Sequence, residues 1–146
     1  MKELLQRSFP FWDGLSREQQ KAMEQGITKT FCEKKTRLHF GGGECAGVQI
    51  IEKGRARIFI TSPNGGDITL FRLMDGDVSI LSAACMLNGM DIELDMEMET
   101  DCTVYTIPKR VYKKLYDESG AVKDYTIEMI SEKFSDIMWL FNQFVF

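Results

Sequence analysis

Short β-type runs separated by turn signals fill the middle of the chain, from Ile27 to Ile107. Val, Ile, Phe, Tyr and Thr are concentrated in the runs, whereas Gly, Asn, Asp and Pro mark the turns, of which SPNGGD is the strongest. Closely spaced strands favour an antiparallel sandwich or barrel over a βαβ fold. The expected strands are 27–32, 36–40, 48–54, 55–61, 68–73, 92–99 and 103–107.

Helices are predicted on both sides of this β region. Residues 1–25 have a helical pattern, in which Ser16 is the expected N-cap of the SREQQKAMEQ stretch and Gly26 ends it. Pro108 is expected at the first position of another helix, because its missing N–H costs nothing there. The fold class predicted from the pattern is therefore mainly β with flanking helices.

One short helix is predicted inside the β region, over SILSAACML, after the Asp75-Gly76 turn and before Asn88. Ser82 is a candidate N-cap, and a helix start offers free backbone N–H groups to an anion or a small ligand. Cys85 lies near that start, where a thiol pKa can be lowered, so an alternative role is redox or electrophile sensing. The alternative is a purely structural role, in which Cys85 is a small packed side chain.

The segment from Ala121 to Phe146 has the most regular apolar pattern of the chain, with successive spacings of three and four residues. We interpret this heptad as the interface of a two-helix homodimer, and the alternative is an ordinary core helix. Met138, Leu140 and Val145 add a second apolar stripe, and the apolar ending FNQFVF suggests a helix that continues further. The predicted interface residues are Ile127, Ile130, Phe134, Ile137, Phe141 and Phe144.

Composition limits the function. A length of 146 residues suits one domain, and a net charge of −4 argues against nucleic-acid binding by this chain itself. There is no run of 18 apolar residues, and the N-terminal MKELLQRSFPFW lacks the apolar core of a signal peptide. The sequence therefore predicts a cytoplasmic protein that makes no membrane contact.

The order of these elements resembles the sensor domain of the Crp/Fnr superfamily of bacterial transcription regulators. GGGECAGVQIIEKGRARIFI is similar to the family's glycine-acid turn, strand and hairpin, and SPNGGDITLFRLMDGDVSIL to its next hairpin with the Gly76-Asp77 landmark. SEKFSDIMWLF is similar to its dimer helix. The resemblance implies a cyclic-nucleotide-binding-like jelly roll (double-stranded β-helix) over 1–120 and a dimerisation helix over 121–146. It also implies that DNA is bound only through a helix-turn-helix domain absent from this chain.

The polar contacts of the family's nucleotide site are missing here. The Gly-Glu pair that holds the ribose corresponds to Ile80-Leu81, and the Arg and hydroxyl residue that grip the phosphate correspond to Ile92-Glu93. The polar pair that contacts the base falls on Ile137-Met138. The resemblance therefore places an unknown small-molecule effector, rather than cyclic AMP or cyclic GMP, in an apolar pocket. Its expected ligand-binding residues are Ile80, Leu81, Ser82, Ala83, Cys85, Ile92, Glu93, Ile137 and Met138.

The segment DIELDMEMETD supports this conclusion independently of the family. A buried cyclic phosphate needs a cation or several converging donors, and Arg suits it best. This segment has six acidic residues and no basic one, so either face that it turns inward is apolar or anionic. The alternative is a purely structural role of the segment: a solvated acidic edge with Ile92, Leu94, Met96 and Met98 in the core.

Other chemistries have weaker support. Four dispersed cysteines without a CxxC pair predict buried thiols rather than an iron–sulfur cluster, and His39, the single histidine, gives little basis for haem or for a cupin-type metal site. No phosphate loop or nucleophile elbow is present. We expect no enzyme activity, no cofactor and no metal. Two hypotheses stay open: a ligand-responsive sensor, or a structural dimerisation module whose pocket is filled by its own side chains. The deciding cluster would be Leu81, Ala83, Ala84, Cys85, Phe134, Ile137 and Met138.

Overall fold

The β region consists of two four-stranded antiparallel sheets in the computed structural model, which describes residues 1–40, 47–80 and 93–145. The prediction of an antiparallel two-sheet fold is confirmed. One sheet has the order β1-β8-β3-β6, formed by Thr28–Cys32, Cys102–Ile107, Val48–Lys53 and Val78–Ser79. The other has the order β2-β7-β4-β5, formed by Arg37–Phe40, Leu94–Met98, Ala56–Thr61 and Asp67–Leu73.

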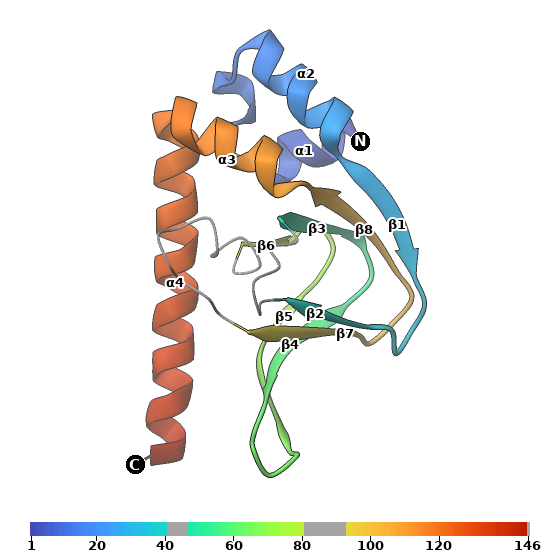
Figure 1. The fold of residues 1–146 in the computed structure, drawn as a ribbon, viewed down its shortest axis with the longest axis vertical. Coiled ribbons are helices and arrows are strands. Elements are labelled where there is room, and N and C mark those ends of the chain that lie inside the picture. The colour runs from blue at the N-terminus through green and yellow to red at the C-terminus, as the bar shows by residue number, and fades with distance from the viewer. Residues whose placement is uncertain (41–46, 81–92, 146) are drawn as a thin grey trace.

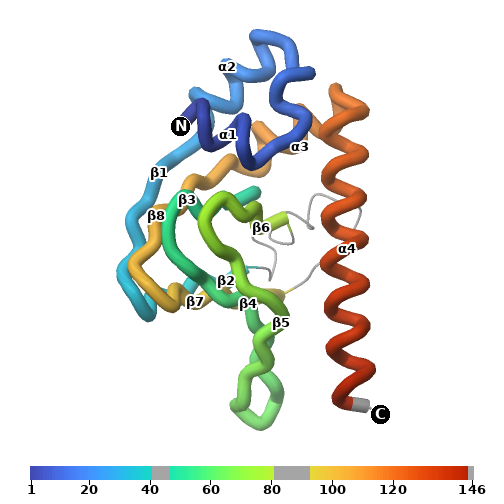
Figure 2. Tube along the Cα trace, turned by 180° about the vertical axis from the view of Figure 1, so that it is seen from behind, coloured from blue at the N-terminus to red at the C-terminus, as the bar shows by residue number. Residues whose placement is uncertain are grey.

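The helices lie at one end and along one side of the sheets (Figure 1). The helices of residues 2–26 and of residues 109–118 gather at the end where the chain begins, while the long C-terminal helix starts beside them and continues along the β region. Figure 2 shows the same arrangement from behind. The elements are α1 (Lys2–Ser8), the 3-10 turn η1 (Trp12–Gly14), α2 (Arg17–Gly26), α3 (Lys109–Glu118) and α4 (Gly120–Val145).

Helix boundaries follow the predicted caps closely. The Ser16 hydroxyl accepts a hydrogen bond from the Gln19 N–H, and the Gln19 side chain accepts one from the Ser16 N–H, which completes a capping box. Pro108 was expected as the first helical residue, but its ψ of 147° is extended and it is the N-cap of α3. The proline therefore ends β8 and its connection, and the helix begins one residue later.

A single apolar core joins the helices to both sheets. Leu5 and Trp12 from the N-terminal helices, Ile50 from β3, Met96 from β7 and Val122 from α4 all belong to it, each at most 2% exposed. The alternation of apolar and acidic residues along β7 explains why Met96 belongs to the core, because period-two spacing turns every second side chain of a strand to the core. The first turns of α4 are thus part of the fold rather than an appendage.

The predicted helix over SILSAACML is wrong at its beginning. Ser79 lies in the two-residue strand β6, opposite Gln49 of β3. The backbone also forms hydrogen bonds here, from the Ile51 N–H to the Asp77 carbonyl oxygen and from the Gly76 N–H to the Ile51 carbonyl oxygen. Pairing with β3 therefore outweighs the small-residue helix signal at this point. Residues 81–87 lie outside the described part of the chain.

Candidate effector site and dimer surface

Two apolar columns run along α4, each with a seven-residue spacing. Ile130 is 9% exposed and Ile137 is half-buried, and both pack against the core of the β region. Ile127, Phe134 and Phe141 form the other column and are exposed. The six predicted interface residues therefore do not share one environment: Ile130 and Ile137 face the β region, and the other four are exposed.

Four of the solvent-facing apolar side chains of α4 make one continuous stripe, because Met138 lies beside the Phe134 column at the i+4 position. We call Ile127, Phe134, Met138 and Phe141 the outward stripe; their exposed fractions are 47%, 60%, 49% and 40%. Phe144, the last predicted interface residue, is 65% exposed. A solvated apolar stripe of this kind on a folded domain indicates an interaction surface.

The orientation of α4 is fixed by its N-terminal half. Thr126 is buried, its hydroxyl lies 2.6 Å from the Tyr112 hydroxyl, and it donates to the Val122 carbonyl oxygen at 2.7 Å. Burial raises the pKa of Tyr125 to about 12, and its ring packs edge-on against Phe9 at 5.8 Å. These contacts determine which face of α4 is turned away from the β region.

The predicted ligand-binding residues are only partly described. Ile80 is 1% exposed, whereas Glu93 is exposed immediately before β7. Ile137 packs against the core, and Met138 belongs to the outward stripe instead. These four therefore do not line one described pocket. The remaining predicted ligand-binding residues lie outside the described residues: Leu81, Ser82, Ala83, Cys85 and Ile92; so does Ala84 of the deciding cluster.

The described apolar residues of the acidic segment are in the core, but the acids are not a freely solvated edge; Ile92 lies outside the described residues. Leu94, Met96 and Met98 are at most 3% exposed, and β7 is an internal strand between β2 and β4. Its two carboxylates are both paired: Asp95 contacts His39, and Glu97 contacts arginines from the neighbouring strands β2 and β4. We call the following set the ionic face: Arg37, Arg55, Arg57, Arg72, Asp67, Glu97 and Glu99.

Arg57 is the centre of the ionic face. Its guanidinium makes a two-bond fork to Asp67, with both distances 3.1 Å, and a 2.9 Å contact to Glu97. It also lies over the Phe59 ring at 4.1 Å, and Phe59 is 1% exposed although the β-bulge next to it interrupts the strand alternation. The ionic face thus covers Phe59 with its own charged side chains, and its acids and arginines are paired with one another.

The pairing shifts the acid–base equilibria of the ionic face in one direction. Hydrogen bonds from Arg57, followed by those from Arg37, hold the pKa of Glu97 below its usual range, and Arg57 likewise lowers the pKa of Asp67. Arg72 lowers the pKa of Glu99. At the rim of the same sheet, a 2.7 Å contact with Asp95 raises the pKa of His39. The acids therefore stay ionised and the cations stay paired.

Buried polar groups in the described residues are few and uncharged. They are the side chains of Gln49, Ser79 and Thr126, so no described cation is buried where it could neutralise a phosphate. The Gln49 Oε1 atom has no hydrogen-bond partner among the described residues, and Gln49 stands in register with Thr106 on β8 and Ser79 on β6. Sequence reasoning missed Gln49, since a single polar residue in the apolar run VQII gave no functional signal.

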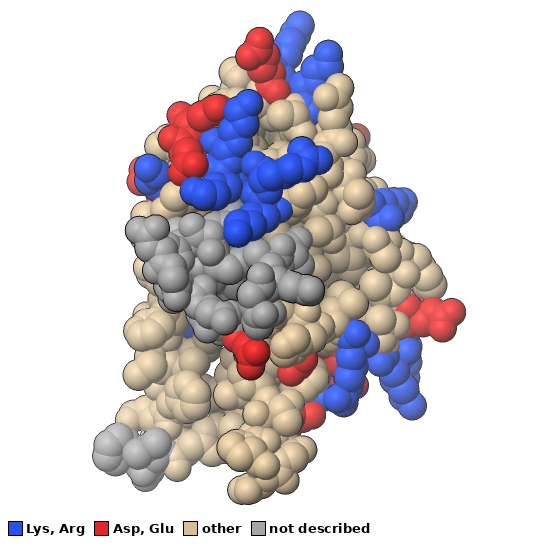
Figure 3. Space-filling view, in the orientation of Figure 1, with Lys and Arg blue, Asp and Glu red and all other residues tan. Residues whose placement is uncertain are grey.

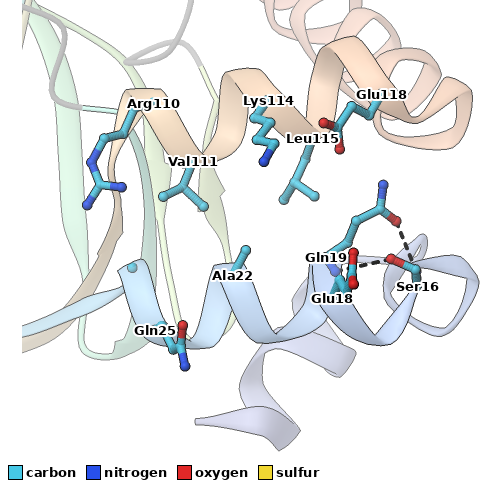
Figure 4. Close-up of a pocket in the computed structure, with 11 residues that line it drawn as sticks. Ser16, Glu18, Gln19, Ala22, Gln25, Arg110, Val111, Lys114, Leu115 and Glu118 are labelled. Atoms are coloured by element: carbon cyan, nitrogen blue, oxygen red, sulfur yellow. Dashed lines mark hydrogen bonds between the residues drawn. The ribbon is translucent and has the colours of Figure 1, made fainter.

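A groove of about 710 Å³ lies between α2 and α3 (Figure 4). Val111 and Leu115 form its apolar part, and Arg110, Lys114 and Glu118 border it. Figure 3 shows basic side chains gathered over this end of the molecule. The borders carry both signs of charge, so the groove by itself selects no class of ligand, and none of the predicted site residues lines it.

No described helix is long and apolar enough to cross a membrane. Within 1–40, 47–80 and 93–145, no group of three His, Cys, Asp or Glu side chains is placed to hold a metal ion. The described part of the chain therefore offers apolar and hydrogen-bonding surfaces rather than a metal centre.

Comparison with known proteins identifies the fold. The family model of the cyclic nucleotide-binding domain matches residues 29–119, more than half of the chain. A structure assigned to the Crp/Fnr family of transcriptional regulators, from Eubacterium rectale ATCC 33656, is 35% identical with a TM-score of 0.86. The alignment covers 93% of this chain and 63% of that one, so this chain spans less than two thirds of the regulator.

More distant structures share the fold alone. The sensor domain of the regulator DNR from Pseudomonas aeruginosa has a TM-score of 0.75 at 14% identity, over 90% of this chain and 87% of that one. Catabolite Activator Protein from Thermus thermophilus has a TM-score of 0.70 at 14% identity, over 93% and 63%. The curated protein sequences contain no match. The predicted jelly roll with N-terminal and C-terminal helices is confirmed.

Proposed function

Because this chain belongs to the cyclic nucleotide-binding domain family and has the sensor fold of Crp/Fnr regulators, we propose that it senses a small effector and dimerises. The observation that carries this proposal is the outward stripe on a helix anchored to the β region. Two copies of the stripe would bury each other in a dimer. Because α4 is anchored to the β region, a change inside that region would shift the two helices relative to each other.

In the proposed dimer, the α4 helices of the two copies are parallel and pack against each other across a twofold axis. Ile127, Phe134 and Phe141 occupy equivalent positions of successive heptads, and Met138 fills the position between the last two. Full burial of each such side chain contributes roughly 1.5–3 kcal/mol. Ile130 and Ile137 hold the helix on its own β region, which couples the interface to the sensor.

The proposed effector is small, uncharged and not a cyclic nucleotide. The absence of a buried cation among the described residues supports this, because a buried phosphate would be left uncompensated. The unpartnered Gln49 Oε1 atom supports an effector that donates one hydrogen bond there. The alternative is a structural module that carries no effector.

The remaining parts of the proposal follow from the family. DNA contact is assigned to a helix-turn-helix domain outside residues 1–146, and the regulator is placed in the cytoplasm with no catalytic role. The division into a sensor over 1–120 and a dimerisation helix over 121–146 is also a proposal. The first residues of α4 belong to the core, so the boundary is one of function rather than of packing.

Native mass spectrometry of the protein as isolated tests the sensor hypothesis. A dimer with extra mass beyond two 16.8 kDa chains would support a bound effector, and that mass would identify its class. A dimer without extra mass, unchanged in melting temperature by any uncharged candidate, would support the structural module. A melting temperature raised by cyclic AMP or cyclic GMP would contradict the proposed exclusion of nucleotides.

A further inference from the structure

Two cysteines that are far apart in the sequence face each other across one rung of a sheet. Cys32 is the last residue of β1 and Cys102 the first residue of β8, and the antiparallel register pairs them directly. Figures 1 and 2 both show β1 lying beside β8 along the margin of the molecule. Directly opposed residues of antiparallel strands have Cα atoms about 4.5–5.5 Å apart, within the span that a disulfide bridges.

Both thiols are free and sheltered in the structure. Cys32 is 7% exposed and Cys102 is 1% exposed, so Cys32 is the thiol that a reagent reaches first. The Cys102 thiol donates toward the Thr100 carbonyl oxygen at 3.3 Å and the Arg55 carbonyl oxygen at 3.5 Å. Gly54 closes the space behind it, because a Cβ there would lie 2.6 Å from Cys102 Sγ.

We propose that Cys32 and Cys102 form a redox-active dithiol that closes an intramolecular disulfide when it meets a low-molecular-weight disulfide such as oxidised glutathione. The site lies on the edge strand β1 and involves neither α4 nor Cys85, so it is independent of the proposed sensor and dimer functions. Closure fastens the edge of the first sheet to its internal strand β8.

The chemistry proceeds by two exchanges. The Cys32 thiolate attacks one sulfur of the small disulfide, forms a mixed disulfide and releases one small thiolate, which takes up a proton. The Cys102 thiolate then attacks the Cys32 sulfur and expels the second small thiol. The protein loses two electrons and two protons, and the oxidant gains both. Burial and the neighbouring Cys102 raise the pKa of Cys32, so the first exchange is slow, on a scale of minutes to hours.

The test uses the whole chain, folded, with oxidised glutathione as the probe. After incubation, free thiols are alkylated and the protein is digested and mapped by mass spectrometry. We expect a reducible cross-link between the peptides of Cys32 and Cys102 and an intact mass about 2 Da lower. Circular dichroism recorded during the reaction shows whether the protein stays folded. C45S/C85S, which keeps only this pair, should give the same cross-link, whereas C32S and C102S should give none.

Three outcomes would overturn the proposal. The first is that both cysteines are still alkylated after a day with the oxidant. The second is that the reaction stops at a glutathione adduct on Cys32. The third is that the cross-link forms only after the circular dichroism signal of the fold is lost. If C45S/C85S fails to fold, the peptide map of the wild-type chain decides the question, because it distinguishes all four cysteines.

Discussion

Two faces of this molecule carry exposed aromatic or charged side chains, and they are built in opposite ways. On the ionic face, each acid has an arginine partner, and Arg57 covers Phe59. On α4, Phe134 stands 60% exposed with no such cover, next to Met138 at 49%. A surface that satisfies itself within one chain needs no partner, whereas the outward stripe is completed only by a second surface. The comparison supports the proposal that α4, and not the ionic face, is the interface of a dimer.

The largest expected effect is on association through the outward stripe. F134E removes a large apolar side chain and places a charge in the proposed interface, which should cost about 3 kcal/mol and weaken dimerisation roughly 100-fold. The matched control is W139E, which makes the same kind of change at a residue that is 65% exposed but lies off the stripe. Sedimentation velocity should show monomers for F134E and dimers for W139E. If the two variants associate equally, the outward stripe is not distinct from the rest of the α4 surface, and its assignment as the interface is wrong.

The ionic face should respond in stability and not in association. R57A removes the nearer of the two guanidinium groups over Phe59, since Arg37 also lies over that ring, and leaves Asp67 and Glu97 without their best partner. We therefore expect a loss of about 2 kcal/mol in the free energy of unfolding. R72A is the control, because Arg72 is half-exposed and Glu99 keeps Arg55; its cost should be below about 1 kcal/mol. Urea unfolding measures both. A change of oligomeric state in R57A would contradict the assignment of the two faces.

Acid should also separate the two faces. The pKa values of Asp67, Glu97 and Glu99 are lowered in the folded state, so their contribution is complete above about pH 5, where unfolded carboxyls are ionised. It is lost as the pH falls through the folded-state values. The urea concentration at the unfolding midpoint should therefore fall as the pH is lowered below about 4. This fall should be less steep in R57A. An equal slope in R57A would show that the ionic face is not the acid-sensitive element.

The smallest expected effect concerns buried polar groups. Q49L removes the acceptor that has no partner, and we expect stability to rise by about 1 kcal/mol or less. T126V removes a hydroxyl that is bonded to Tyr112 and to the Val122 carbonyl, so stability should fall by about 1–2 kcal/mol. Thermal unfolding of the two variants gives the sign. A loss of stability in Q49L would mean that the amide is satisfied after all.

Local patterns predicted most of the fold. The alternation in LDMEM, the turn at SPNGGD and the cap at Ser16 each determine a feature through neighbours in sequence, and all three are confirmed. β6 was missed because its two residues are held by pairing with β3, which no local signal reports. The position of Pro108 was wrong by one residue, since proline suits the cap and the first helical position almost equally.

The functional surfaces were harder to predict because they depend on contacts between distant residues. The heptad on α4 was visible, but a sequence cannot show which of two adjacent columns packs on the β region. Ile130, predicted at the dimer interface, packs against the β region, and Met138, predicted at the ligand, is exposed on the outward stripe. The acidic strand was interpreted without Arg57, which joins it only through the β4–β7 register. Cys32 and Cys102 meet for the same kind of reason.

The most direct test of the account is the mass of the unmodified protein in solution at micromolar concentration. The outward stripe predicts a particle of two 16.8 kDa chains, measured by sedimentation equilibrium at several concentrations. A single species of 16.8 kDa up to about 100 μM, a concentration at which even a weak interface of this kind associates, would contradict the central claim. The exposed aromatic residues of α4 would then need a different partner.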